Sequence, residues 1–139
     1  MSFGFSAGDI AQCIKLLVRI GKAIKDSDDS AAEYQSAVKF LEGVERTVQV
    51  VEGLLHNHQD LTYRNDLETL AIQLVTTVTQ FREKTEGYET SLGVNPTTSW
   101  AKKARKRVQL NLFGDIDQLK SDVSYPQSNL NDLICVQVL

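Results

Sequence analysis

The sequence contains few cysteines and no long apolar run, and these absences limit where the protein can work. Only two of the 139 residues are cysteines, Cys13 and Cys135, near opposite ends of the chain. Cys13 falls on an apolar stripe, which is typical of a buried, reduced thiol in an intracellular protein. No segment approaches the roughly 20 apolar residues of a membrane-spanning helix. The N-terminus lacks the pattern of a secretory signal because its charges follow the first apolar residues.

The charge of the chain argues against nucleic-acid binding. The formal net charge is -3 at pH 7, whereas nucleic-acid-binding domains are usually strongly basic. The only Asn-X-Thr triplet, at Asn95, has proline in its middle position and is therefore no glycosylation acceptor. We expect a cytoplasmic protein that binds no nucleic acid.

Motifs for catalysis and metal binding are also missing. The chain has no glycine-rich phosphate loop, nucleophile elbow or paired zinc-ligand motif. His56 and His58, with Asp60, form the only histidine cluster, and they supply too few convergent donors for a metal. We expect no cofactor, no metal, no small-molecule substrate and no enzymatic activity, with a small helical-bundle enzyme as a third and remote hypothesis.

The pattern that is present is helical. Apolar residues recur at spacings of three and four in the regions 7–25, 30–55, 65–88 and 99–125, separated by short polar segments. Ser30 and Glu33 form a capping box at the start of the second region. Pro126 should kink or end the last helix, with a short helix near Leu130. The sequence predicts one all-α domain, residues 1–139: an up-and-down bundle of four main helices, the last one broken near Pro126.

The N-terminal 25 residues combine an aromatic leader, containing Phe3 and Phe5, with a basic amphipathic helix. The apolar stripe of this helix consists of Ile10, Cys13, Ile14, Leu17, Gly21 and Ile24. Its cations, which project elsewhere, are Lys15, Arg19, Lys22 and Lys25. Such a segment can seal a bundle, or it can leave the bundle and lie on an anionic membrane. Solvent exposure of Phe3 and Phe5 would distinguish these alternatives.

A second basic cluster follows the only tryptophan. Its residues are Trp100, Lys102, Lys103, Arg105, Lys106 and Arg107. Near an anionic leaflet each cation contributes about 1 kcal/mol, and tryptophan favours the interface. Alternatively, Trp100 packs into the end of the bundle and the cations are solvated or paired. The second and third helices are acidic on balance, so the basic regions can attract either anionic lipid or a neighbouring copy, head to tail.

Four segments resemble the fungal HeLo-like N-terminal domains. They are the opening Met-Ser-Phe-Gly-Phe-Ser-Ala-Gly-Asp at 1–9, Glu33-Tyr-Gln35, Tyr88-Glu-Thr-Ser-Leu-Gly93 and Phe113-Gly-Asp-Ile-Asp-Gln-Leu-Lys120. The resemblance covers roughly residues 1–125. It implies a helical signalling module of fungal cell-death or incompatibility proteins. In the better-understood members the N-terminal segment leaves the bundle on oligomerisation and permeabilises membranes.

The sequence therefore leaves two functions from different classes open. The first is a non-catalytic signalling and oligomerisation module, recruited to the plasma membrane through residues 1–25 and the cluster at 102–107. The second is a structural adaptor bundle that contacts only proteins. Both predict protein partners or self-association, and only the first predicts anionic lipid.

Overall fold

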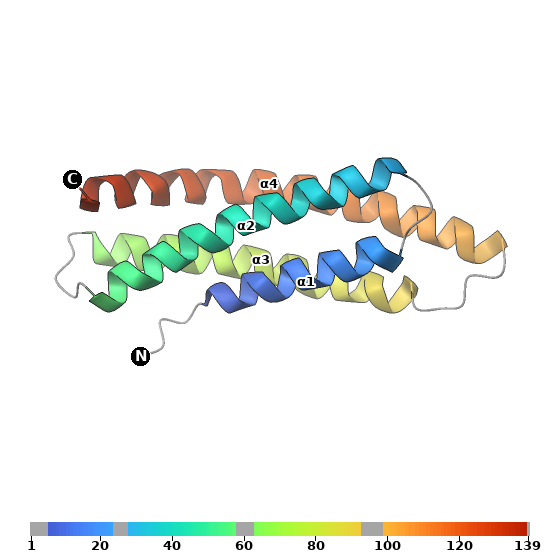
Figure 1. Cartoon of the computed structure of the whole chain (residues 1–139), viewed down its shortest axis with the longest axis horizontal. Coiled ribbons are helices and arrows are strands. Elements are labelled where there is room, and N and C mark those ends of the chain that lie inside the picture. Colours follow the sequence, from blue (N-terminus) through green and yellow to red (C-terminus); the bar gives the residue numbers. More distant parts are fainter. Residues whose placement is uncertain (1–5, 24–27, 58–62, 93–98, 139) are drawn as a thin grey trace.

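The computed structural model describes residues 6–23, 28–57, 63–92 and 99–138; positions 23, 28–31, 89–92, 99–106, 108, 137 and 138 are described by their backbone alone. These residues form four helices and no strand: α1 (Ala7–Ala23), α2 (Asp28–Asn57), α3 (Arg64–Leu92) and α4 (Ser99–Val138). Consecutive helices run in opposite directions along the long axis (Figure 1). The predicted all-α, up-and-down bundle is confirmed.

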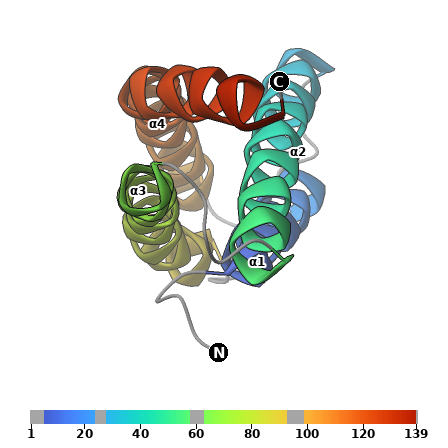
Figure 2. The same ribbon diagram turned by 90° about the vertical axis from the view of Figure 1, so that its left-hand side faces the viewer.

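α1 packs against two helices, α2 and α3. In the described part of the chain α1 contacts both of these helices but not α4, so α1 and α4 occupy opposite corners of the bundle (Figure 2). With 17 residues, α1 is also the shortest helix, against 30 in α2 and 40 in α4. It therefore covers only part of the α2 and α3 surface.

Side chains at helical spacing form one continuous core. The fully buried residues of α1 include Ile10, Cys13 and Leu17, as the apolar stripe predicts. The buried face also includes Leu16 and Ile20, because α1 packs against two helices rather than one. Ile14 and Gly21 of the predicted stripe are only partly buried and lie at its α2 edge, and Ile24 lies outside the described residues.

The start of α1 is fixed by local and tertiary hydrogen bonds. Ser6 caps the helix: its Oγ accepts the Gly8 amide hydrogen at 3.1 Å, and its carbonyl accepts that of Asp9 at 3.1 Å. The Ala7 amide donates to Oε1 of Glu52 on α2 at 2.6 Å. A carboxylate at a helix N-terminus is favourable because it faces free amides and the positive end of the dipole. This contact anchors α1 to α2.

Two expected boundaries are wrong. α2 begins at Asp28, so Ser30 lies within its first turn and does not precede the helix. α4 is not broken near Pro126 but continues through it to Val138 as a single helix. A proline inside a helix costs about 3 kcal/mol or more. Burial of Val123 before the proline and Leu130 after it offsets this cost, since each fully buried aliphatic side chain contributes about 1.5–3 kcal/mol.

Candidate functional site

Three of the four predicted cations of the first helix lie on the outer face of α1, and the fourth, Lys25, lies outside the described residues. Lys15, Arg19 and Lys22 are all exposed, and Val18 beside them is 38% exposed. The buried stripe and this basic face are on opposite sides of the helix. In the docked state, α1 therefore presents charge to solvent and not its main apolar surface.

The second basic cluster lies in the first turns of α4. Figure 1 shows these turns, in light orange, extending past the ends of the other three helices, at the same end of the bundle as the C-terminus of α1. Arg107 is exposed. The side chains of Trp100, Lys102, Lys103, Arg105 and Lys106 lie outside the described set, as do Phe3 and Phe5.

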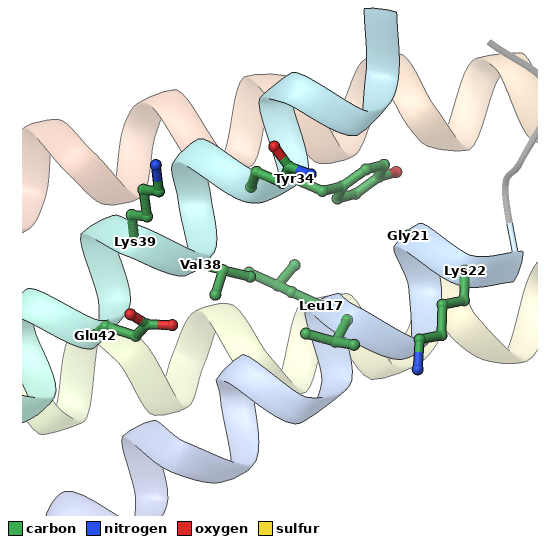
Figure 3. A pocket seen from close by; sticks show the side chains of 9 residues that line it. Leu17, Gly21, Lys22, Tyr34, Val38, Lys39 and Glu42 are labelled. Atoms are coloured by element: carbon green, nitrogen blue, oxygen red, sulfur yellow. The ribbon is translucent and has the colours of Figure 1, made fainter. Parts of the chain in front are cut away.

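A groove between α1 and α2 was not predicted from the sequence. It encloses about 460 Å³ and lies along the outer edge of the α1–α2 contact (Figure 3). We call it the α1–α2 groove. Its lining residues are Leu17, Val18, Gly21, Lys22, Tyr34, Gln35, Val38, Lys39 and Glu42. The volume falls within the range of about 300–1,000 Å³ that is typical of small-ligand sites.

The floor of the α1–α2 groove is aliphatic and aromatic. Leu17, Val18 and Val38 line it from the two helices, and the ring of Tyr34 lies against Gly21 of α1. A Cβ atom at Gly21 would lie 3.5 Å from Cγ of Tyr34, an ordinary contact distance. The ring extends over Gly21, and its other neighbour is Phe113 of α4, with ring centroids 5.4 Å apart.

The hydroxyl of Tyr34 is the one chemically unusual group in the lining. Tyr34 is 5% exposed, and its oxygen is buried with no hydrogen-bond partner among the described residues. Burial raises the pKa of this phenol from 10.0 to about 12, because the charged phenolate is poorly solvated there. Buried tyrosine hydroxyls usually have a partner. Tyr34 thus carries a buried hydroxyl whose hydrogen bond no described residue accepts.

Charged side chains border the α1–α2 groove at both ends. Lys22 lies at the Gly21 end, whereas Lys39 and Glu42 lie at the other end (Figure 3). The ring of Tyr34 reaches toward the Lys22 end. One end of the groove is therefore cationic, and the other carries charges of both signs.

Two other residues with raised pKa values, Cys13 and Tyr88, pack within or between helices and stabilise the fold. Burial raises the pKa of Cys13 to about 12, which the positive charge of Arg82 only partly opposes, so the thiol stays protonated. Tyr88 donates to Oδ2 of Asp115 at 2.7 Å, and Lys84 bonds Oδ1 at 3.1 Å. The hydrogen bond from Tyr88 to Asp115 raises the pKa of Tyr88 to about 12. This network joins α3 to α4.

The histidine pair gives no candidate metal site within the described ranges. His56 lies exposed in the last turn of α2, and His58 falls outside them. No three potential metal-binding side chains converge in this part of the molecule. No helix there combines the length and hydropathy that crossing a bilayer requires.

No protein-family model, curated protein or solved structure matches the chain. The resemblance to fungal HeLo-like domains therefore rests on the sequence motifs alone. The residues that sequence reasoning missed as a site are Tyr34, Val38 and Gly21, which lie within the apolar helical regions predicted at 7–25 and 30–55. Gly21 within the apolar stripe was the available signal, since a glycine contributes no side chain to the contact with the facing helix.

Proposed function

We propose that this chain is a non-catalytic signalling module that associates with anionic membrane surfaces through the basic face of α1. The observation that carries the proposal is the exposure of Lys15, Arg19 and Lys22 on one helix. The basic segment at the start of α4 adds to this charge at the same end of the bundle.

The protonation states of the perturbed groups support a non-catalytic role. The pKa values of Cys13, Tyr34 and Tyr88 are raised to about 12, so these groups release their protons even less readily than usual. A protonated thiol or phenol is a poor nucleophile or base. Membrane association also needs no catalytic group, because surface charge attracts juxtaposed cations directly.

Vesicle co-sedimentation tests the proposal. Vesicles that contain phosphatidylserine should bind the protein more tightly than neutral vesicles, and binding should weaken as salt shortens the Debye length. Lys15→Gln/Arg19→Gln should weaken binding by about 30-fold if each cation contributes about 1 kcal/mol.

Lys39→Gln/Arg46→Gln is the matched control. It removes the same charge from the exposed face of α2, where Glu42 and Glu45 lie nearby, and should change binding much less. Equal binding to neutral and anionic vesicles would contradict the proposal and favour the structural adaptor. A leakage assay on the same vesicles tests membrane permeabilisation, the further activity that the family resemblance implies.

A further inference from the structure

A furrow runs along the outer contact of α3 and α4. Figure 2 shows these two helices on one side of the bundle, with α1 and α2 on the other. The furrow consists of three hollows of about 380, 380 and 150 Å³, and consecutive hollows share Gln73, or Thr77 and Asp122. We call it the α3–α4 furrow and propose that it binds the basic outer face of α1 from a second copy of this chain, so that copies associate head to tail.

The α3–α4 furrow is acidic. Asp66 of α3 and Asp132 of α4 line the hollow at one end, and Asp122 lines the other two hollows. All three aspartates are exposed. Among the described residues that line the furrow, Lys84 is the single cation, and it already pairs with Asp115 at 3.1 Å. The negative charge of the three aspartates therefore attracts a cationic partner.

The outer face of α1 carries the opposite charge in a regular order. Lys15 and Lys22 are exposed and seven residues apart, which is about 10 Å along a helix. Val18 lies between them and is 38% exposed. An apolar side chain is thus flanked by a cation on each side along the helix.

The α3–α4 furrow repeats this order with carboxylates in place of cations. Its middle hollow is lined by Ile72, which is 39% exposed, and by Pro126. Asp122 precedes Pro126 along α4 and Asp132 follows it, and the two aspartates are about 15 Å apart along the helix. Flexible lysine side chains bridge the difference between the two spacings. Val18 of one copy can therefore lie on Ile72 of the next, between two ion pairs.

The length of the α3–α4 furrow also fits α1. From Asp66 to Lys84 the furrow follows about 27 Å of α3, and the 17 residues of α1 span about 25 Å. The footprint of one such helix, about 25 Å by 10 Å, is well below the roughly 800 Å² per partner of a stable interface. We therefore expect weak association that becomes measurable at high protein concentration.

The exposed face of α2 is a poorer partner for α1. Glu33 and Glu42 are exposed there, but Lys39 and Arg46 are exposed on the same helix. The cations of a second α1 would face charges of both signs on α2, and the like charges would repel them. Charge complementarity therefore favours the α3–α4 furrow.

The α1 face and the α3–α4 furrow are separate surfaces of one copy, and α1 and α4 occupy opposite corners of the bundle (Figure 2). A contact between these surfaces is heterologous, so a pair of copies retains one unused α1 face and one unused furrow. Association should therefore continue past the dimer as the concentration rises.

Sedimentation velocity of the purified chain tests the proposal. At low salt the weight-average sedimentation coefficient should rise with concentration and pass the value of a dimer. It should fall toward the monomer value when about 0.5 M salt shortens the Debye length. A chain that stays monomeric up to about 1 mM at low salt, or that stops at a dimer, would overturn the proposal.

Charge-reversal variants identify the two surfaces. Lys15→Glu/Lys22→Glu and Asp122→Lys/Asp132→Lys should each associate at least about tenfold more weakly than the parent, because two exposed pairs change from attraction to repulsion. An equimolar mixture of the two variants should regain association to within about threefold of the parent, since each α1 face then meets a furrow of opposite charge. A mixture that associates no better than its components would reject this pairing of surfaces.

Glu33→Lys/Asp117→Lys is the matched control. It changes the net charge as much as Asp122→Lys/Asp132→Lys, at two exposed positions that do not line the furrow, and should leave association within about twofold. Circular dichroism establishes that each variant is folded before sedimentation. The proposal does not rest on membrane association, because Asp122→Lys/Asp132→Lys keeps every cation of α1 and should not weaken vesicle binding. The two proposals can therefore fail separately.

Discussion

Replacing Tyr34 by phenylalanine should stabilise the protein. A buried hydroxyl without a partner costs about 1–3 kcal/mol, and deleting it removes this penalty. Loss of the oxygen volume offsets part of the gain, and the ring contact with Phe113 is retained. We expect the free energy of unfolding to rise by about 0.5–2 kcal/mol. For 139 residues this corresponds to an increase in Tm of about 2–7 °C.

The gain from Tyr34→Phe should grow in alkali. In the folded protein the pKa of Tyr34 is raised from 10.0 to about 12, so between these values the unfolded chain loses the proton first. Ionisation of this group therefore leaves stability unchanged below pH 10 and lowers it as the pH rises from 10 through 12. Two pH units correspond to roughly 2–3 kcal/mol. The phenylalanine variant lacks this loss.

Urea unfolding at pH 7 and pH 11 measures both the gain in stability and its pH dependence. The proteins compared are the parent and the variants Tyr34→Phe, Tyr125→Phe and Tyr88→Phe. Tyr125→Phe is the matched control: Tyr125 is 75% exposed, and the change should stay within about 0.5 kcal/mol. Tyr88→Phe should destabilise by about 1–2 kcal/mol because it removes a hydrogen bond to Asp115. A Tyr34→Phe variant less stable than the parent protein at pH 7 would refute the reasoning, since the hydroxyl would then have a partner.

Three further predictions concern α1. Leu17→Ala should lower the free energy of unfolding by about 2–5 kcal/mol in urea titrations, and a change below about 0.5 kcal/mol would show that α1 is not packed as described. Glu52→Gln should cost about 1 kcal/mol and speed hydrogen exchange of the Ala7 amide, because the charged acceptor at the helix start is lost. A thiol reagent at pH 8 should label exposed Cys135 quickly and Cys13 only after unfolding; rapid labelling of both would contradict a buried thiol with a pKa of about 12.

The helices of this protein are predictable because their determinants are local. The spacing of Ile10, Cys13 and Leu17 follows the 3.6-residue period, and Ser6 caps the helix that contains them. The β-branched residues between Val75 and Thr79 lie within α3, as expected when burial outweighs propensity. Up-and-down connectivity follows from the short polar segments between the helices.

The path of α4 could not be predicted in the same way. Proline gives a local signal to end a helix, and no local feature of the sequence opposes it. The cost of the proline is offset by the burial of Val123 and Leu130 on either side of it. These side chains pack against helices that are distant in sequence. The partners of Glu52 and Tyr88 are equally non-local, since they lie 45 and 27 residues away.

By itself, the amino-acid sequence determined four amphipathic helices, the buried stripe of α1 and the basic face opposite it, because the backbone period dictates which side chains share a face. Only the tertiary structure decided that α1 docks against α2 and α3, that α4 continues through Pro126, and that a groove opens beside Tyr34. These features depend on the distance and rotation between helices, which are set by packing among residues far apart in the chain.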